Sequence, residues 1–91
     1  KIEAARLLTW KSAAENDAGI RNTESAAHAK RFAADTAMEV TTDAVQIYGG
    51  YGYSEEYPVA RLMRGAKVMQ IYEGSSQVQR MIIGREITKD L

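Results

Sequence analysis

The sequence predicts an all-α fold, and three observations lead to that prediction. Apolar residues make up 45% of the 91-residue chain but aromatic residues only 8%, and alanine supplies much of the difference. Alanine has the highest helix propensity and lets helices pack closely. Proline occurs once, at Pro58, and apolar residues recur at helical intervals in four segments. Because the connections between these segments are short, the sequence favours one domain folded as an antiparallel four-helix bundle.

The first predicted helix covers residues 2–18. Its apolar residues begin with Ile2, Ala5 and Leu8, which recur at helical intervals with charged residues between them. The run Asn-Asp-Ala-Gly at residues 16–19 is typical of a helix end, because Gly19 suits the left-handed conformation that often follows one. A short connection then leads to the next helix.

The second predicted helix is the longest. Asn22 or Thr23 can cap its start, and Glu24 lies in the first turn, where the helix dipole favours an anion. One apolar face continues for about 25 residues, as expected of an amphipathic helix. The glycine pair at residues 49–50 is predicted to end it.

Two shorter segments complete the predicted bundle. A glycine–aromatic loop covers residues 48–53, and a third helix opens near Pro58, because proline is tolerated in a first helical turn. A connection that contains Glu73 leads to the last predicted helix, residues 76–89.

The composition excludes several classes of function. Twelve basic and twelve acidic residues cancel, so no net charge attracts nucleic acid or an anionic membrane. The chain has no cysteine and one histidine, His28, which excludes thiolate and histidine metal sites. No apolar run approaches the roughly 20 residues of a membrane span, and we find no signal peptide. Because the chain starts at Lys1 within a predicted helix, we expect it to be a piece of a longer protein.

Glu73 is the first candidate for chemistry, and two interpretations of it remain open. A glutamate just ahead of a helix can stabilise the free N–H groups and the helix dipole. In a water-poor pocket beside Tyr72, the same carboxylate can instead act as a proton acceptor. Gly74 would let a substrate backbone or a thioester approach closely.

The glycine–aromatic loop is the second candidate. A glycine pair after a long helix commonly caps it, and the pattern lacks the strand-to-helix context of a dinucleotide fingerprint. Because the C-terminal end of a helix repels phosphate, a phosphate ligand here would need the loop's own amides and a donor such as Gln46. The tyrosines of the loop can stack on a ring, form a wall of the bundle or contact another subunit.

Several runs of the sequence resemble the C-terminal helical domain of acyl-CoA dehydrogenases. Residues 43–53 read Asp-Ala-Val-Gln-Ile-Tyr-Gly-Gly-Tyr-Gly-Tyr, and residues 71–80 read Ile-Tyr-Glu-Gly-Ser-Ser-Gln-Val-Gln-Arg. The runs at 21–23, 29–33, 56–59 and 62–64 are also similar to that family. The resemblance covers essentially the whole chain, with the motifs in the family's order.

The resemblance implies that Glu73 is the general base that removes the α-proton of an acyl-CoA thioester. The β-hydrogen would leave as a hydride to N5 of FAD, giving the trans-2-enoyl-CoA. A thioester α-proton is weakly acidic, so the base must be desolvated and the developing enolate must be stabilised by donors. In this family those donors include the flavin ribityl chain and a backbone amide, a position that the amide of Glu73 matches.

The resemblance also implies binding residues. The candidates for contact with FAD are Gln46, Ile47, Tyr48, Gly49, Gly50, Ser75 and Gln77. Of these, residues 46–50 match a segment that reaches the adenosine-diphosphate half of a neighbouring subunit's cofactor. Ser75 replaces the threonine that is common in the family but keeps its hydroxyl. Tyr72 and Gly74 are the candidates for contact with the acyl-CoA.

The resemblance further implies a homotetrameric parent enzyme of fatty acid β-oxidation, located in the bacterial cytoplasm or the mitochondrial matrix. It would pass electrons to an electron-transferring flavoprotein. Family enzymes also have an N-terminal helical domain and a middle β-domain, which residues 1–91 lack, so we expect the isolated chain to be inactive. Two alternatives stay open: a non-catalytic helical module for oligomerisation, with Glu73 as a helix cap, and an acyl-CoA oxidase of the same fold.

Overall fold

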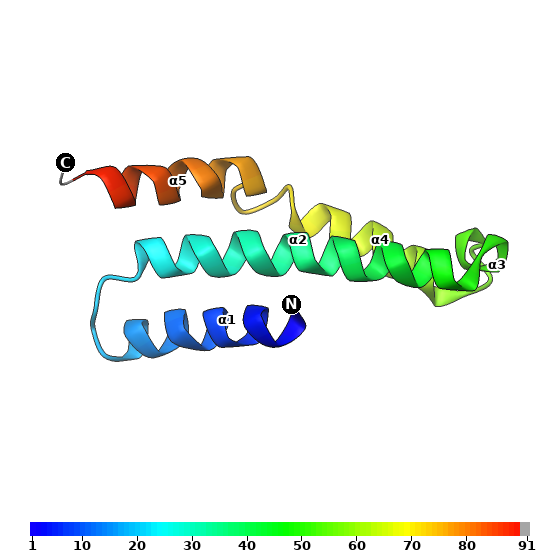
Figure 1. Cartoon of the computed structure of the whole chain (residues 1–91), viewed down its shortest axis with the longest axis horizontal. Coiled ribbons are helices and arrows are strands. Elements are labelled where there is room, and N and C mark those ends of the chain that lie inside the picture. The colour runs from blue at the N-terminus through cyan, green and yellow to red at the C-terminus, as the bar shows by residue number, and fades with distance from the viewer. Residues whose placement is uncertain (90–91) are drawn as a thin grey trace.

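The structure is a computed structural model that describes residues 1–89 (Figure 1). Within this range it contains the helices α1 (Ile2–Asp17), α2 (Thr23–Tyr48), α3 (Gly50–Tyr53), α4 (Pro58–Met69) and α5 (Ser76–Thr88). The prediction of an all-α fold is confirmed. The four predicted helices correspond to α1, α2, α4 and α5, with ends that agree to within a residue or two.

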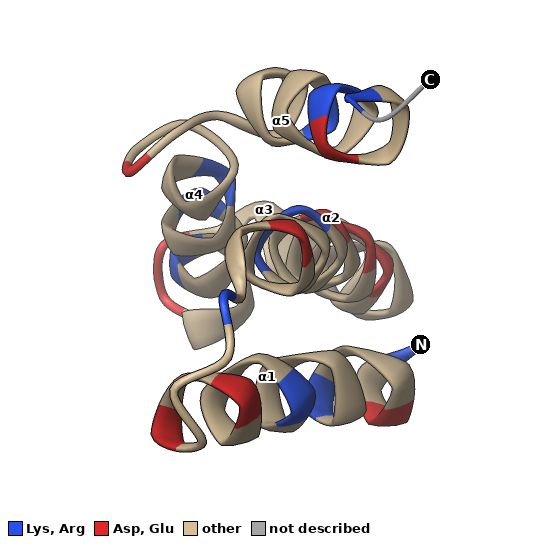
Figure 2. Cartoon of the chain, turned by 90° about the vertical axis from the view of Figure 1, so that its left-hand side faces the viewer, with Lys and Arg blue, Asp and Glu red and all other residues tan. Residues whose placement is uncertain are grey.

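The long helix α2 is the element on which the others pack. Helices α1, α4 and α5 all contact α2 and run antiparallel to it, and α4 and α5 follow one another along its length (Figure 1). Viewed from its end, the molecule has α1 on one side of α2 and α5 on the other (Figure 2). Within residues 1–89, α5 contacts neither α1 nor α4. The result is an elongated antiparallel assembly of 50 × 23 × 19 Å.

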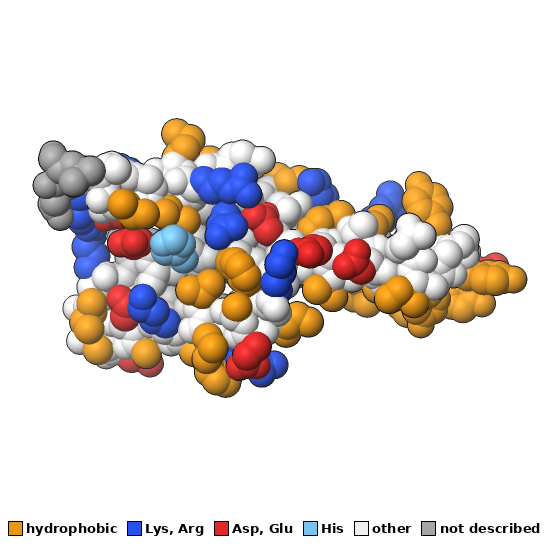
Figure 3. All heavy atoms as spheres, in the orientation of Figure 1, with side chains coloured by type: hydrophobic (Ala, Val, Ile, Leu, Met, Phe, Trp, Pro, Cys, Tyr) orange, Lys and Arg blue, Asp and Glu red, His pale blue; other side chains and the backbone are white. Residues whose placement is uncertain are grey.

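The core of this assembly is made of small side chains. Its buried apolar residues are Ala27, Ala29, Ala34, Val59, Ala60 and Ala66. Many larger apolar side chains remain on the surface, among them Trp10, which is 62% exposed, and Ile47, which is 83% exposed. The space-filling view shows such side chains gathered around α3 at one end of the molecule (Figure 3). Exposed apolar surface of this kind marks contacts with other protein segments.

The end of α1 has the predicted geometry. Gly19 adopts a left-handed φ of 75°. Its amide donates to the carbonyl oxygen of Asn16, and the amide of Ile20 donates to that of Glu15. These two bonds form a Schellman motif, which satisfies carbonyl groups that the helix leaves without partners.

The start of α2 differs from the prediction. Asn22 occupies the N-cap position, but neither it nor Thr23 makes a capping hydrogen bond with its side chain. Instead, Nδ2 of Asn22 donates to the backbone oxygen and to Oγ of Ser12, at 3.1 and 3.2 Å. The side-chain amide of Asn22 thus joins the α1–α2 connection to α1, because the buried Ser12 offers this amide two acceptors.

The prediction of a loop after α2 was wrong for residues 50–53, which form the single helical turn α3. Gly49, with φ 67° and ψ −143°, interrupts the helical backbone between α2 and α3. Gly52 is buried, and a Cβ atom there would lie 2.6 Å from Cβ of Tyr48 and from the backbone oxygen of Val45. Glycine at this position therefore allows α3 to fold back closely against the end of α2.

None of the helices in residues 1–89 combines the length and hydrophobicity that a bilayer crossing requires. In the same range, no group of three or more His, Cys, Asp or Glu side chains is arranged to hold a metal ion.

Candidate functional site

The candidate site is built on the connection between α4 and α5, which carries Glu73. After α4 the chain turns at Glu73, with φ 56°, and at Gly74, with φ 88°. Among residues 1–89, Glu73 is the one non-glycine residue with a positive φ. Such a conformation costs a non-glycine residue about 1–2 kcal/mol. It persists only where surrounding contacts hold it.

The N-cap of α5 is Ser75, not Glu73. Oγ of Ser75 accepts a hydrogen bond from the amide of Val78 at 3.2 Å. The side chain of Glu73 lies two residues before this cap and is exposed. Capping of α5 is therefore already provided without the Glu73 carboxylate, which leaves that carboxylate available for another role.

Asp35 of α2 binds both ends of this connection. Its Oδ1 accepts hydrogen bonds from Nε2 of Gln70 at 2.7 Å and from Oγ of Ser76 at 2.8 Å. Its Oδ2 lies 3.4 Å from Arg80 and 3.8 Å from Arg31. Burial raises the pKa of Asp35, but the two hydrogen bonds and the two cations outweigh burial and hold its pKa below the ordinary value of 3.8. Asp35 is therefore ionised at neutral pH.

Two more side chains bind the backbone around Glu73. Nζ of Lys30, from α2, donates to the carbonyl oxygens of Met69 and Gly74. Nε2 of Gln79, from α5, donates to the carbonyl oxygen of Glu73 at 3.4 Å and to that of Gly74 at 3.2 Å. Gln79 is buried whereas the Glu73 side chain is exposed. The backbone of the connection is thus bound on its inner side.

Tyr72 lies next to these contacts. Its ring is half exposed, and Nζ of Lys30 lies 5.9 Å from the ring centre, within the range of a cation–π interaction. The same lysine therefore contacts Tyr72 and the carbonyl oxygen of Gly74, the two residues predicted to contact the acyl-CoA.

A pocket of about 260 Å³ opens beside the connection. Its walls include the predicted cofactor-binding residues Ser75 and Gln77, together with Asp35, Gln70 and Arg80. Hydroxyl, amide and guanidinium groups at these positions can donate hydrogen bonds to the oxygen atoms of a polar or anionic ligand. The pocket is thus chemically suited to a ligand that carries hydroxyl or phosphate groups.

The other predicted cofactor-binding residues lie elsewhere. Gln46, Ile47 and Tyr48 occupy the C-terminal end of α2, and Gly49 and Gly50 follow them. Gln46 lies eleven positions after Asp35 on the same helix, which is roughly 16 Å at 1.5 Å per residue. Within one chain, the structure therefore brings Glu73, Gly74, Ser75 and Gln77 together but leaves residues 46–50 apart from them.

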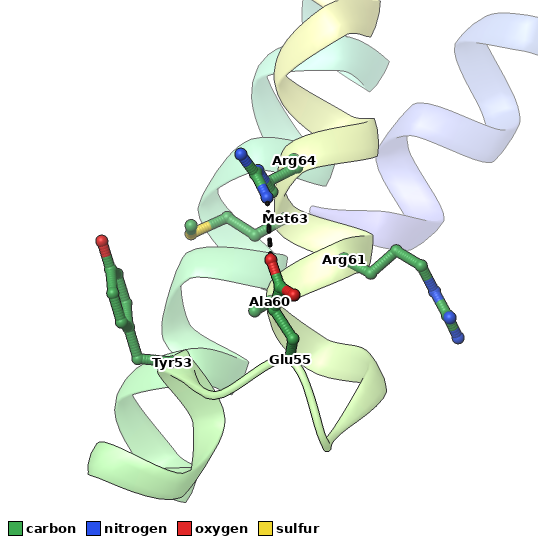
Figure 4. Close-up of a pocket in the computed structure, with 6 residues that line it drawn as sticks. All are labelled: Tyr53, Glu55, Ala60, Arg61, Met63 and Arg64. Carbon is green, nitrogen blue, oxygen red and sulfur yellow. Dashed lines mark ion pairs between the residues drawn. The ribbon is translucent and has the colours of Figure 1, made fainter.

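A second, larger pocket lies near α3 and the start of α4 and shares no lining residue with the first (Figure 4). It has a volume of about 560 Å³ and is lined by Tyr53, Glu55, Ala60, Arg61, Met63 and Arg64. Two of these residues, Arg64 and Glu55, form an ion pair at 3.5 Å. Both side chains of this pair are largely exposed, so it contributes little to stability.

Lys30, Asp35 and Gln79 are not among the site residues predicted from the sequence. A signal was present for the first two, because they are charged residues within the alanine-rich middle of α2. Their role depends on contacts with residues about forty positions later in the chain. No local pattern specifies such partners.

Comparison with known proteins places the chain in a family. The family described as "Acyl-CoA dehydrogenase, C-terminal domain" matches residues 1–88. The chain is 56% identical over 90 residues to a cyclohexane-1-carbonyl-CoA dehydrogenase of Geobacter metallireducens, covering 99% of this chain and 24% of that protein. It is 62% identical over 84 residues to a short-chain-specific acyl-CoA dehydrogenase of Megasphaera elsdenii, covering 92% of this chain and 22% of that protein.

Solved structures agree with these relatives. Butyryl-CoA dehydrogenase from Megasphaera elsdenii superimposes with a TM-score of 0.90 and 60% identity, over 93% of this chain and 22% of that one. A chain from a study of the electron transferring flavoprotein of Acidaminococcus fermentans gives a TM-score of 0.93 and 55% identity, over 97% of this chain and 23% of that one. The chain spans about a quarter of the length of the curated relatives it matches. The chain belongs to the acyl-CoA dehydrogenase family, in the region of that family's C-terminal domain.

Proposed function

We propose that the chain is the C-terminal part of a flavin-dependent enzyme that α,β-dehydrogenates acyl-CoA thioesters to trans-2-enoyl-CoA, with Glu73 as the general base. The observation that carries this proposal is the left-handed backbone of Glu73, bound from both α2 and α5. Strained conformations of this kind are retained mainly at functional sites. Because Ser75 caps α5, the Glu73 carboxylate is not needed as a helix cap and stays available for chemistry.

The protein's own residues suit an FAD cofactor. Ser75 and Gln77 would hold it beside the connection, where Arg80 supplies a further donor to its oxygen atoms. When bound, FAD supplies the acceptor for the hydride that leaves the substrate's β-carbon. The separation of residues 46–50 from Glu73 favours contact between that segment and the cofactor of a neighbouring subunit. Such contact fits a homotetramer with sites completed between subunits.

Glu73 would take the α-proton of the thioester onto its carboxylate. A base in this role is more effective when water is excluded from it. In the structure of residues 1–89, however, the Glu73 side chain is exposed to solvent. In the proposed enzyme, FAD, the acyl-CoA and the N-terminal helical and middle β-domains would cover it. Gly74 and Tyr72 would border the bound thioester, and the amide of Glu73 would donate to the developing enolate oxygen.

The relatives support a proposal for the partners and the location. Their names describe acyl-CoA dehydrogenases of bacteria, and one structural match comes from work on an electron transferring flavoprotein. We therefore propose acyl-CoA as the substrate, an electron-transferring flavoprotein as the electron acceptor and the bacterial cytoplasm as the location. The rate at which the reduced enzyme reacts with oxygen distinguishes this dehydrogenase from an oxidase of the same fold.

The whole enzyme carrying Glu73→Gln tests the proposal. This variant keeps the shape of the side chain and removes the base. We expect flavin reduction by acyl-CoA, followed anaerobically by loss of flavin absorbance, to fall by about 100-fold or more, with FAD still bound. Glu56→Gln, a change of an exposed acid outside the site, is the matched control and should reduce at the wild-type rate. A near-normal rate of flavin reduction in Glu73→Gln would contradict the role of Glu73 as the base and would favour the alternative of a helical module for oligomerisation.

A further inference from the structure

We infer that Asp35 is a positioning residue for the general base: by holding both ends of the α4–α5 connection on α2, its carboxylate determines where Glu73 lies. This inference rests on the proposed function of Glu73. Asp35 does not touch the substrate in this role. It acts through the connection, from a different helix and 38 positions earlier in the sequence.

The geometry of the connection supports this role. Gln70 and Ser76 stand three residues before and three residues after Glu73. Both donate to the same oxygen atom, Oδ1 of Asp35, at 2.7 and 2.8 Å. The amide of Ser76 also donates to the carbonyl oxygen of Gln70 at 3.0 Å. Residues 70–76 thus form a loop whose two ends meet at one carboxylate oxygen, with Glu73 at the midpoint.

The other oxygen of the carboxylate keeps Asp35 in place. Oδ2 lies 3.4 Å from Arg80 of α5 and 3.8 Å from Arg31, one turn earlier on α2. Oδ1 is therefore left to the two loop donors, while Oδ2 faces the two cations. Hydrogen bonds to an ionised acceptor are stronger and shorter than those between neutral groups. Displacing either end of the loop would break one of them.

Glu73 needs such restraint because its own backbone preference opposes the observed conformation. A left-handed φ is unfavourable for glutamate, so a connection freed at its ends would relax toward other conformations. Lys30 binds the carbonyl oxygens of Met69 and Gly74, and Gln79 binds those of Glu73 and Gly74. In residues 1–89, Asp35 is the side chain that accepts hydrogen bonds from both Gln70 and Ser76, the two end residues of the loop. Loss of Asp35 therefore allows the carboxylate of Glu73 to move.

Movement of the base affects rate more than binding. Proton transfer requires the base to lie within hydrogen-bond reach of the α-proton, and a misplacement of about 1 Å can reduce a rate about 100-fold. A contact that is made only in the transition state changes the rate and leaves ground-state binding unchanged. We expect loss of the Asp35 bonds to lower the rate of flavin reduction at saturating substrate while leaving substrate affinity nearly unchanged.

The test uses the whole enzyme with Asp35→Ala and Asp35→Asn. For Asp35→Ala, flavin reduction at saturating acyl-CoA should fall about 10- to 100-fold. Asp35→Asn should lose less, because its amide oxygen still accepts both loop bonds without the charge. Rates are expressed per bound FAD, because Asp35 lines the pocket beside the predicted cofactor-binding residues. Affinity for a non-reacting thioether analogue of acyl-CoA should stay within about twofold of wild type, as positioning alone predicts. The primary isotope effect with α-deuterated substrate should rise, because proton removal then limits the rate more strongly.

The matched control is Glu86→Gln. Glu86 is a buried carboxylate that, like the half-buried Asp35, is paired with cations, but its partners Arg21 and Lys89 lie at the far end of α5 from the connection. This variant should lose thermal stability and keep the wild-type rate of flavin reduction. If Asp35→Ala fails to fold, Ser76→Ala provides the second test, because it removes one loop bond, leaves Asp35 intact and should lower the rate in the same direction.

The outcomes separate this inference from the proposed function. Wild-type rates for Asp35→Ala and Ser76→Ala beside a severe loss for Glu73→Gln would overturn the positioning role and leave Glu73 as the base. Rate loss that only parallels loss of FAD or of substrate affinity would also overturn it, because a structural role predicts that pattern. A normal rate for Glu73→Gln would overturn the proposed function and this inference together.

Discussion

Arg21 donates two hydrogen bonds to the carboxylate of Glu86, at 3.1 Å from Nη1 to Oε2 and at 2.8 Å from Nη2 to Oε1. The two residues lie 65 positions apart, so this pair joins the α1–α2 connection to α5. The Glu86 side chain is only 4% exposed, and Nζ of Lys89 lies 2.8 Å from it. A buried carboxylate requires such partners. The pair therefore secures the C-terminal half of α5 against the start of α2.

The Glu86 pair predicts a loss of stability in acid. The hydrogen bond from Lys89 lowers the pKa of Glu86 most, burial raises it, and the charge of Arg21 lowers it further, so the pKa lies below the ordinary value of 4.5. Because the unfolded chain binds the proton more tightly, protonation favours unfolding. The stabilisation is complete above pH 4.5 and is lost as the pH falls through the lower folded pKa.

Thermal unfolding of the wild type and of Glu86→Gln, from about pH 7 to about pH 3, measures this effect. The wild type should be more stable at neutral pH, and the difference between the two proteins should shrink on acidification. A difference that is the same at every pH would show that the ionised carboxylate contributes nothing.

The left-handed backbone at position 73 predicts an order of stability between two amides. Glu73→Asn and Glu73→Gln both remove the charge, but asparagine adopts left-handed conformations far more readily than glutamine. We expect Glu73→Asn to be the more stable variant, by about 1 kcal/mol, in chemical denaturation. Equal stability of the two variants would mean that residue 73 is not left-handed in solution.

The close packing of α3 predicts different responses at two neighbouring glycines. An alanine Cβ at position 52 would lie 2.6 Å from the backbone oxygen of Val45, whereas at position 50 it would meet nothing within 4 Å. Gly52→Ala should therefore cost about 1–3 kcal/mol, and Gly50→Ala should change stability by less than about 0.5 kcal/mol. Chemical denaturation of both variants measures this difference, and a stable Gly52→Ala would contradict the observed packing.

The cap of α5 predicts the effect of removing one hydroxyl. Ser75→Ala loses the acceptor for the amide of Val78 and should destabilise the protein by about 1 kcal/mol. Ser75→Thr keeps the hydroxyl and should cost much less. Measurement of FAD content in the same variants of the whole enzyme tests the cofactor-binding role of Ser75. An alanine variant as stable as the threonine variant would show that this cap is not needed.

Local patterns were sufficient to predict most helix ends. Gly19 ends α1 and Pro58 begins α4 because each residue's own backbone preference suits that position. The turn α3 was missed because a Gly-Tyr-Gly-Tyr run has low intrinsic helix propensity. Its helical turn depends instead on the close contact of Gly52 with the end of α2.

The candidate site likewise has a part that the sequence predicted and a part that it did not. Glu73, Ser75 and Gln77 lie within one continuous run, so their proximity followed directly from the sequence. Asp35 and Gln70 are 35 residues apart, and their hydrogen bond depends on how α4 and α2 pack. Whether Glu73 caps α5 was also decided by the structure, in which Ser75 is the N-cap of that helix.

By itself, the sequence determined the all-α class and the extent of the longer helices, because helix propensity, capping residues and hydrophobic periodicity act over a few neighbouring residues. The resemblance to a family came from the motifs at residues 43–53 and 71–80. Only the tertiary structure decided that α2 is the central helix, that Asn22 bonds to Ser12 and that Asp35 binds both ends of the connection around Glu73. These features depend on contacts between residues far apart in the chain. Such pairings arise when the helices pack, and no short segment specifies its distant partner.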